Sequence, residues 1–468
     1  MKARPHATGP GAAPDITARR PAAARAPAAA GAPVTTGPDG HPDASGSRSA
    51  ISDPALAGSG ARRIDWADRA MPVLRLLRDR FTADRPLDGL TVSACLHVTA
   101  ETAALVRVLL AGGARVFLAA SNPLSTQDDT AASLACDYGA AVFARAGVDR
   151  SAYYRNIHRA IMGDGAGPDI VLDDGGDLVN TLHTDRADLV PSVRGGCEST
   201  TTGVIRLRQM AAEGALGFPV VAANDTPAKR LMDNRYGAGQ SVLDGIIRAT
   251  NTLLAGRTVV IAGYGYCGTG LAERARGLGA HVIVTEVDPV RAMDAVLQGF
   301  RVLPMAAAAP LGDLFITATG NRDVITGEHL TAMRDGAILA NAGHFNVEID
   351  VEALARQAVQ VNHDVRPHTG EYVLDDGRRL LLLAEGRLVN LVAAEGHPAA
   401  VMDLSFATQA LAVAWLAGEG STLGPDVHDV PETINAEISR LALASAGVQI
   451  DALTAAQQAY LESWRAGS

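Results

Sequence analysis

The segment Gly263-Tyr264-Gly265-Tyr266-Cys267-Gly268 constrains the fold of this chain more than any other feature. It follows an apolar run, Val259–Ala262, that predicts a buried strand, and helical sequence begins at about Thr269. Glycines at Gly263, Gly265 and Gly268 allow a tight turn and let the backbone approach a pyrophosphate at a helix N-terminus. Glu286 ends the next predicted strand, where its carboxylate accepts hydrogen bonds from a ribose and repels the extra phosphate of NADP. The segment therefore predicts an NAD site rather than a purely structural turn.

Strand-like and helix-like runs alternate on both sides of this segment. Before it, residues 90–96, 114–119, 169–172 and 220–223 read as strands, and a helix is expected over 103–111. A second series of the same kind runs from about 258 to about 392. Such alternation is typical of a parallel sheet covered by helices. We predict an α/β chain with two doubly wound parallel-sheet domains and a C-terminal tail.

The two ends of the chain differ from this pattern. The first residues are rich in Ala, Pro, Gly, Arg and Ser without hydrophobic periodicity, which predicts a disordered extension. The expected divisions are this extension over 1–60, one sheet domain over 61–238 and 397–430, a Rossmann domain that binds NAD over 239–396, and a tail over 431–468.

Composition narrows the class of partner. A net charge of −10 repels phosphate backbones and anionic lipids, and 4% aromatic residues are too few for a nucleic-acid stacking platform. The four cysteines show no C-x-x-C spacing, so we expect no disulfide framework, no metal and a reducing cytoplasm. No uninterrupted apolar run reaches the ~20 residues of a membrane span. We expect no nucleic-acid or membrane partner.

Lysine occurs only at Lys2 and Lys229. Arginine serves as the surface cation elsewhere, and a lysine can release a proton where an arginine effectively cannot. Asp233 follows Lys229 by four residues, on the same face if the segment is helical, and Asn234 is its neighbour. These residues predict a proton-transfer site; the alternative is an ordinary surface ion pair.

Histidines and aspartates gather at the ends of predicted strands. His97 ends the first strand, and Asp174 belongs to the run Asp173–Asp177 after another. His344 and His397 occupy glycine-flanked loops in the second half. Ligands bind at the carboxyl ends of parallel strands, so these side chains are expected to share a crevice, although a single histidine is more often a core residue.

Several ordered stretches resemble the S-adenosyl-L-homocysteine hydrolase family from about residue 64 to the C-terminus. They are Leu96–Thr99, Asn122–Asp128, Asp173–Asp177, Thr200–Gly203, Asp233–Gly237, Gly343–Asp350 and Glu385–Asn390. The ending Tyr460–Trp464 is similar to the archaeal-type branch.

The resemblance implies a tightly bound, recycled NAD that oxidises the 3′ carbon of an adenine nucleoside. The C4′ proton is then removed, the 5′ leaving group is eliminated and the ketone is reduced again. By resemblance, Lys229, Asp233, Asn234, His97 and Asp174 are catalytic; Thr99, Glu101, Thr102, Ser199, His344 and His397 bind substrate; and Thr200, Thr201, Thr202, Asn234, Asn341 and Asn390 join the glycine segment and Glu286 at the cofactor. The tail implies a homotetramer or homodimer.

One position departs from the family pattern. The pattern Glu-Glu-Thr-Thr-Thr reads Glu198-Ser199-Thr200 here, so a carboxylate that grips the ribose is replaced by serine. Losing such a partner costs about 1.5–3 kcal/mol. We therefore expect a specialised nucleoside dehydratase that releases an unsaturated sugar, which resembles the nucleoside-antibiotic paralogue that forms the exocyclic alkene of angustmycin. The alternative is an authentic S-adenosyl-L-homocysteine hydrolase; a non-catalytic NAD-binding regulator and an unrelated Rossmann dehydrogenase are the remaining hypotheses.

Overall fold

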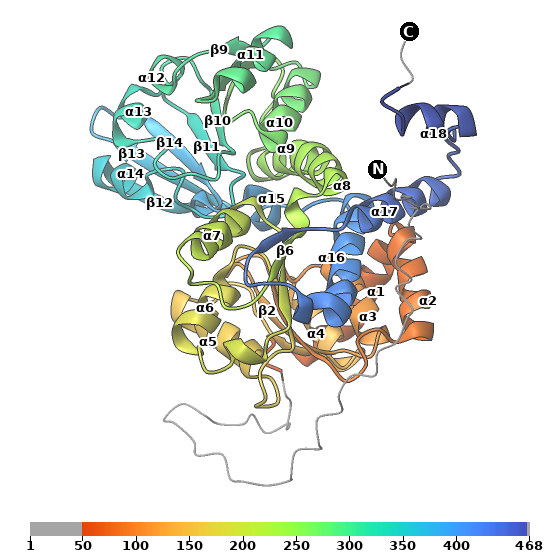
Figure 1. The fold of residues 1–468 in the computed structure, drawn as a ribbon. Helices are drawn as coiled ribbons and strands as arrows, with labels where there is room; N and C mark the ends of the chain where they lie inside the picture. The colour runs from red at the N-terminus through yellow and green to blue at the C-terminus, as the bar shows by residue number, and fades with distance from the viewer. Residues whose placement is uncertain (1–48, 466–468) are drawn as a thin grey trace.

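The computed structural model describes residues 49–465, which form two sheets with helices packed on their faces (Figure 1). The predicted fold class is confirmed. The helices are α1 Ala57–Arg69, α2 Pro72–Asp84, α3 Ala100–Ala111, α4 Asp128–Cys136, α5 Arg150–Met162, α6 Asp177–Asp185, α7 Thr201–Ala212, α8 Pro227–Lys229, the π-helix η4 Arg230–Gly237, α9 Ala238–Thr250, α10 Tyr266–Gly277, α11 Pro289–Leu297, α12 Met305–Ala308, α13 Gly327–Ala332, α14 Val351–Gln357, α15 Val389–Val392, α16 Ala399–Glu419, α17 Glu432–Ser445 and α18 Ala455–Leu461.

The first sheet is entirely parallel, in the order β15-β6-β5-β4-β1-β2-β3. Its strands are β1 Thr91–Leu96, β2 Arg115–Ala120, β3 Ala141–Phe143, β4 Ile170–Asp173, β5 Gly195–Glu198, β6 Val220–Ala222 and β15 Val427–Asp429. The strand order reverses between β1 and β4. In open parallel sheets this switch point leaves a crevice at the carboxyl ends of the two strands, where ligands bind.

The second sheet has the order β12-β13-β14-β11-β10-β7-β8-β9. Its parallel strands are β7 Thr258–Ala262, β8 His281–Thr285, β9 Arg301–Val302, β10 Leu314–Thr317, β11 Ala337–Asn341 and β14 Arg379–Leu383. The sequence did not predict the antiparallel strands β12 Ala358–Arg366 and β13 Thr369–Leu374, which extend one edge. The order reverses between β7 and β10, so this sheet also has a switch point, and the glycine segment follows β7 directly.

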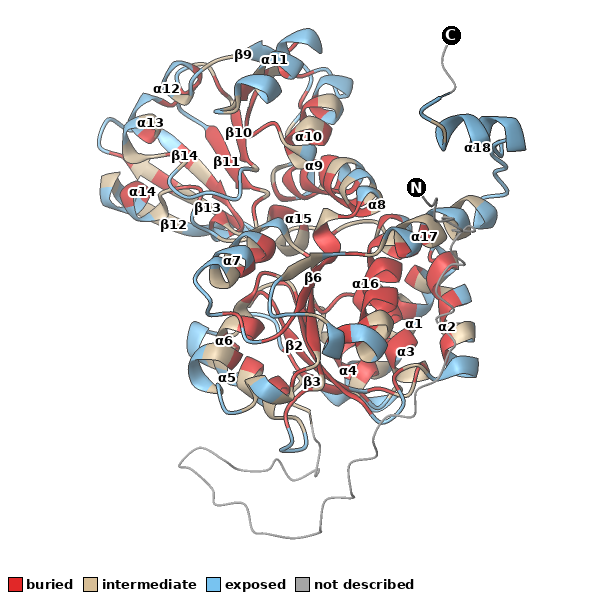
Figure 2. Ribbon diagram, viewed as in Figure 1, coloured by how far each residue is buried: buried red, intermediate tan, exposed pale blue. Residues whose placement is uncertain are grey.

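Alternate residues of the strands enter cores on opposite faces. In β1, Ala94 and Leu96 pack with α3 and α16 residues on one face, whereas Cys95 lies in the core formed with α5 and α6 on the other. Figure 2 shows the central strands of both sheets in the colour of buried residues. β5 was missed because glycines have low strand propensity. The structure explains the glycine at position 195: a Cβ there would lie 2.8 Å from the side chain of Leu416 on α16, so a larger residue does not fit.

Helix α16 belongs to the first core. The stretch Ala399–Thr422 is long and apolar enough to cross a membrane by composition, yet 67% of its apolar window is buried inside the protein. Asp403 on this helix accepts hydrogen bonds from the backbone N–H groups of Val73 and Leu74, and so caps α2. These contacts identify α16 as a core helix of the first sheet.

The N-terminal prediction needs a correction for its described part. Residues 49–60 are not a disordered extension, because Ala50 forms a parallel bridge with Phe143 at the sheet edge and α1 begins at Ala57. Backbone pairing of this kind leaves no hydrophobic pattern in a sequence. The rest of the predicted extension, residues 1–48, lies outside the described residues.

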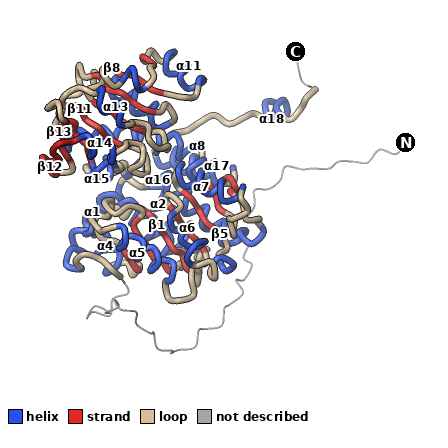
Figure 3. The backbone as a smooth tube through the Cα atoms, turned by 90° about the vertical axis from the view of Figure 1, so that its left-hand side faces the viewer, coloured by secondary structure: helices blue, strands red, loops and turns tan. Residues whose placement is uncertain are grey.

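The C-terminal segment divides into two parts. Helix α17 packs on the first core through Ile434 and Ile438, which are fully buried. Helix α18 has no buried residue and lies away from the body of the chain (Figures 1 and 3). Only the part after α17 therefore has the character of a separate tail.

Candidate active site

The carboxyl ends of β1 and β4 lie where the first sheet domain contacts the second, at the place where a switch point predicts a ligand crevice. His97 follows β1, and its ring lies 5.9 Å from the ring of His344, which follows β11 of the second sheet. A Cβ built on Gly320 of the second sheet would lie 3.7 Å from the Thr202 hydroxyl of the first. Residues from both predicted domains therefore meet at the two switch points.

His97 and Asp174 form the centre of the first group. The Nε2 atom of His97 lies 3.0 Å from Oδ2 of Asp174, and its Nδ1 atom lies 2.6 Å from the Ser125 hydroxyl. Ser199 donates a hydrogen bond of 2.9 Å to Oδ1 of Asp174. One potential ligand atom each from His97, Asp174 and His344 lies within 4.8 Å of the other two. A metal ion could bind at this spacing, although the sequence predicted no metal site.

The surroundings set the charges of this group. Burial opposes ionisation of Asp174, but the adjacent His97, His344 and the Ser199 hydroxyl outweigh it and hold the pKa of Asp174 below its usual range. Burial lowers the pKa of His344 from 6.5 to about 4. At neutral pH the crevice thus contains an ionised carboxylate beside a neutral imidazole, a combination suited to accepting and donating protons.

Glu198, a buried acid next to this group, organises the backbone. Burial, together with Asp173 and Asp174, raises the pKa of Glu198 well above normal. Its Oε1 atom accepts hydrogen bonds from Gly175 N at 3.0 Å and from the N–H and hydroxyl of Thr200 at 2.8 and 2.9 Å. Thr200 is the N-cap of α7, so the structure gives its side chain a structural role that the family pattern did not predict.

Lys229 lies at the point where the first sheet domain leads into the second. It ends α8, is only 8% exposed, and its Nζ atom lies 2.7 Å from Oδ1 of Asn234 and 3.1 Å from Oδ1 of Asn224. The same ammonium lies 3.3 Å from Oδ1 of Asp233. The predicted pairing of Lys229 with Asp233 is present, and the surface ion pair considered as its alternative is excluded by the burial.

The π-helix η4 explains why both Asp233 and Asn234 reach Lys229. An α-helix brings residues four apart onto one face, whereas the wider π turn also brings residues five apart together. Burial opposes ionisation of Asp233, but Lys229 and His397, with a hydrogen bond of 2.9 Å from Ser405, hold its pKa below the usual range. Asp233 is therefore a carboxylate with donors on both oxygens.

The second switch point carries the glycine segment. Gly263 has φ +94°, and a Cβ on Gly268 would lie 1.9 Å from the Gly263 carbonyl oxygen, so side chains are excluded there. Glu286 accepts hydrogen bonds from Tyr264 N at 2.7 Å and from Val287 N at 2.6 Å, which fixes its carboxylate beside the turn. Gly265 caps α10 in extended conformation, leaving the helix N-terminus to a pyrophosphate.

The two asparagines predicted at the cofactor differ. Asn341 uses its side chain inside its own loop: Nδ2 donates to the carbonyls of Gly343, Phe345 and Gly386. It therefore positions the loop that carries His344. Asn390 donates to Ser241, while its Oδ1 atom is buried without a partner among the described residues. An orphaned amide oxygen of this kind fits the carboxamide of a nicotinamide, so the residues present fit NAD.

The residues predicted to contact the nucleobase already have hydrogen-bond partners within the protein, which the sequence did not predict. Thr99 caps α3, and Thr102 donates its hydroxyl to the His97 carbonyl at 2.6 Å. Burial raises the pKa of Glu101 at the start of the same helix. The His397 ring contacts Ser241 and Asp233, so neither ring nitrogen is free for a base. In the threonine run, the Thr201 hydroxyl lies 3.4 Å from Oδ1 of Asn224.

Sequence reasoning missed several polar partners. Five further polar residues contact the predicted site or its loops: Ser125, Asn224, Ser241, Ser405 and Glu348. The only signal available was a polar residue inside an apolar run, as at Ser405 in α16, and that pattern does not reveal which residue it contacts.

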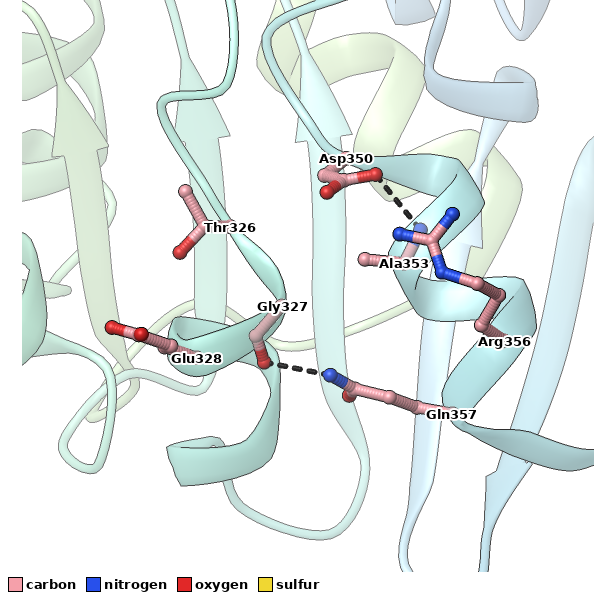
Figure 4. Close-up of a pocket in the computed structure, with 7 residues that line it drawn as sticks. All are labelled: Thr326, Gly327, Glu328, Asp350, Ala353, Arg356 and Gln357. Carbon is pink, nitrogen blue, oxygen red and sulfur yellow. Dashed lines mark hydrogen bonds between the residues drawn. The ribbon is translucent and has the colours of Figure 1, made fainter.

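A separate pocket of about 550 Å³ opens between α13 and α14 (Figure 4). It is lined by Thr326, Gly327, Glu328, Asp350, Ala353, Arg356 and Gln357. Gln357 donates to the Gly327 carbonyl at 2.8 Å across it. None of the predicted site residues lines this pocket, so it is not part of the crevice.

Comparison with known proteins gives consistent matches. A family model described as S-adenosyl-L-homocysteine hydrolase matches residues 48–191, and one described as the NAD binding domain of that enzyme matches residues 234–396. The adenosylhomocysteinase of Aquifex aeolicus (strain VF5) is 54% identical over 418 residues, covering 89% of this chain and 99% of that protein.

Two archaeal relatives are equally similar. The adenosylhomocysteinase of Saccharolobus solfataricus is 53% identical over 418 residues, 89% of this chain and 99% of that protein. The S-inosyl-L-homocysteine hydrolase of Methanopyrus kandleri is 53% identical over 419 residues, 90% of this chain and 98% of that protein. Lys229 and Asp233 lie between the two segments that match the family models.

The low pKa of His344 predicts acid sensitivity. Between pH 6.5 and about 4 the unfolded chain binds a proton at this histidine that the folded protein does not, so stability present above pH 6.5 is lost as the pH falls. We expect His344→Gln to remove roughly 1–2 kcal/mol of the stability loss between about pH 7 and about pH 5, measured by urea unfolding. His363→Gln on the exposed edge strand is the control, and an unchanged pH dependence in His344→Gln would contradict the assignment.

Proposed function

The chain belongs to the S-adenosyl-L-homocysteine hydrolase family and is an NAD-dependent enzyme of that family; from this premise we propose that it hydrolyses S-adenosyl-L-homocysteine to adenosine and homocysteine, reversibly. The observation that carries the proposal is the burial of the single lysine of the described residues against Asp233 and Asn234, beside the NAD-binding domain. A buried proton-transfer pair at this place suits oxidation of a sugar hydroxyl.

In this proposal the Lys229–Asp233 pair and the His97–Asp174 pair carry out different proton transfers. When bound, NAD supplies reversible removal of a hydride from the sugar C3′. We assign Lys229 and Asp233 to the proton of the 3′ hydroxyl, with Asn234 holding the ammonium. His97 and Asp174 take the C4′ proton and return a proton to the 5′ leaving group, because a carboxylate-bound imidazole can serve as base and then as acid.

The remaining predicted residues take supporting roles in this proposal. Ser199 orients Asp174, and His344 closes the crevice from the second domain. We assign Thr99, Glu101 and Thr102 to the side of the base, and we do not assign His397 there because both of its ring nitrogens already have partners. We assign Thr200, Thr201, Thr202, Asn341 and Asn390 to the side of the nicotinamide, and Gly263, Gly265, Gly268 and Glu286 to the rest of NAD. We further propose that the first domain comprises 49–238 with 397–445 and the second 239–396, which extends the expected limits 61–238 with 397–430, and we propose a cytoplasmic location.

The prediction that this enzyme is a specialised nucleoside dehydratase is not supported. The relatives that match across nearly the whole chain are named adenosylhomocysteinase and S-inosyl-L-homocysteine hydrolase, and they favour the alternative. In the structure the Ser199 hydroxyl also has a defined partner, the carboxylate of Asp174, so its presence does not require a different substrate. We take adenine as the base, and the hypoxanthine of the Methanopyrus kandleri relative's substrate becomes a comparison for the assay.

The exposed tail supports an assembled enzyme. Leu453, Tyr460, Leu461 and Trp464, in and around α18, are 59–88% exposed, and the outward face of α11 exposes Val290 and Leu297 by 76% and 78%. Apolar area of this extent is typical of a contact with another chain. We propose that the tail packs on a second copy in a homotetramer or homodimer.

Incubation of the NAD-loaded protein with adenosine and homocysteine tests the reaction. We expect condensation to the thioether, because hydrolysis is reversible, and its hydrolysis when the thioether is supplied alone, both followed by mass spectrometry. Inosine serves as the comparison nucleoside. Absence of condensation together with loss of one water from a nucleoside would reject the hydrolase in favour of the dehydratase.

Replacing the buried lysine tests the proton-transfer assignment. Lys229→Arg keeps a cation against Asp233 but removes a group that can release its proton. We expect bound NAD to be retained while its reduction by adenosine, followed by absorbance, slows about 10²–10⁴-fold. Arg230→Lys, on the exposed side of the same segment, is the matched control. Reduction at the normal rate in Lys229→Arg would remove Lys229 from the proton transfer.

Removing the tail tests assembly. A chain that ends at Gly447 lacks α18 and its apolar residues, and we expect a smaller oligomer by light scattering because that contact area is lost. Glu462→Lys in the full chain changes the charge at the C-terminal end of α18 without removing an apolar residue and is expected to keep the native mass. An unchanged mass in the shortened chain would overturn the tail contact.

A further inference from the structure

A series of hydrogen bonds connects Asn390 to Asp233 through His397 and through Ser241, a residue to which no role has been assigned. Nδ2 of Asn390 lies 3.1 Å from Oγ of Ser241, and that hydroxyl lies 2.8 Å from Nδ1 of His397. Nε2 of His397 lies 3.3 Å from Oδ1 of Asp233, the oxygen that also faces Lys229. The chain therefore runs from the orphaned amide at the cofactor side to the catalytic pair.

The direction of each hydrogen bond follows from the carboxylate. Asp233 is ionised and can only accept, so Nε2 of His397 carries the proton that faces it. In a neutral imidazole the other nitrogen, Nδ1, then has no proton and must accept, which requires Ser241 to donate its hydroxyl hydrogen. The Ser241 oxygen in turn accepts from Asn390, whose Nδ2 can only donate. In this series of hydrogen bonds, each donor thus points toward Asp233.

The residues that form this series of hydrogen bonds come from the elements that join the two domains. Ser241 lies in the first turn of α9, Asn390 on α15, and His397 in the loop that leads to α16. Close packing holds them: a Cβ on Gly245 of α9 would lie 2.7 Å from the Val389 carbonyl oxygen, and one on Gly237 would lie 3.1 Å from the His397 ring. Ser241 and Asn390 are 2% and 3% exposed, so water does not replace these contacts.

We propose, on the basis of the function proposed above, that Ser241 is a positioning residue that fixes His397 in its Nε2-protonated tautomer and so keeps Asp233 available to Lys229. Without the Ser241 donor, Nδ1 of His397 keeps only Nδ2 of Asn390 as a donor, at the long distance of 3.5 Å, and the proton of His397 can move to Nδ1. A lone pair on Nε2 would then face the Asp233 carboxylate, which favours protonation of Asp233 and weakens its hold on the ammonium. The effect is on proton transfer, not on binding of the nucleoside.

The other titratable groups around His397 and Asp233 do not account for such an effect. Lys229 is the partner already described. Burial raises the pKa of the Cys267 thiol on α10 to about 11, so it is neutral at working pH. Glu395, in the loop of His397, pairs with Arg63 at 2.7 Å, and Asp403 on α16 caps α2.

Two isosteric variants separate the hydroxyl from packing. Ser241→Thr keeps a donor and Ser241→Val removes it at the same volume, while Ser241→Ala removes it without added bulk. We measure bound NAD first, then the rate at which adenosine reduces it as a function of pH. For the Ala and Val variants we expect the acidic limb to move up by about one pH unit and the rate near neutrality to fall about tenfold. Ser241→Thr should keep the native pH profile.

The outcomes distinguish this inference from the proposed function. If the unmodified enzyme does not reduce its bound NAD with adenosine, the proposed function fails. If it does, and Ser241→Ala has the native pH profile, the positioning role is rejected. Equal profiles for the Thr and Val variants also reject it, because packing alone would then explain the change. A rise in KM for adenosine without a shifted profile counts against it too, since that points to substrate binding.

Discussion

The carboxylate of Asp233 is the contact on which the arrangement of the site depends. It lies in a π-helix between the two sheets and accepts from Lys229, His397 and Ser405, which come from three separate elements. Leaving a buried carboxylate unpaired is costly, so these donors must stay in place for the chain to fold as it does. The same requirement brings the lysine and both interdomain connections to one point.

Parallel topology supplies the rest of the geometry. Both sheets have a switch point, between β1 and β4 in the first sheet and between β7 and β10 in the second. His97 and Asp174 therefore come from neighbouring strands of one sheet, while the glycine segment and the loop of His344 come from the other. The protonation pattern has two causes: His97, His344 and the Ser199 hydroxyl keep Asp174 ionised against the effect of burial, and burial keeps His344 neutral to a lower pH than in water.

The serine at position 199 shows how a departure from a family pattern depends on its surroundings. As sequence it suggests a lost ribose contact and a changed outcome of the reaction. In the structure its hydroxyl donates to Asp174, one of the residues assigned to proton transfer. The strong matches to thioether hydrolases across the chain then favour the ordinary reaction.

The sequence by itself determined the parallel α/β class, the NAD segment after β7 and the pairing of Lys229 with Asp233, because each is encoded over a few residues of strand, turn or helix spacing. Only the tertiary structure decided that Asn234 also reaches the lysine, that Thr200 and Thr102 serve their own backbone, and that Ser241 and His397 connect to Asp233. The first two depend on local backbone geometry, a π-helix and helix caps, that residue type alone does not specify. Ser241 and His397 are 156 residues apart, and hydrophobic periodicity predicts which face of an element is buried but not which residues that face contacts.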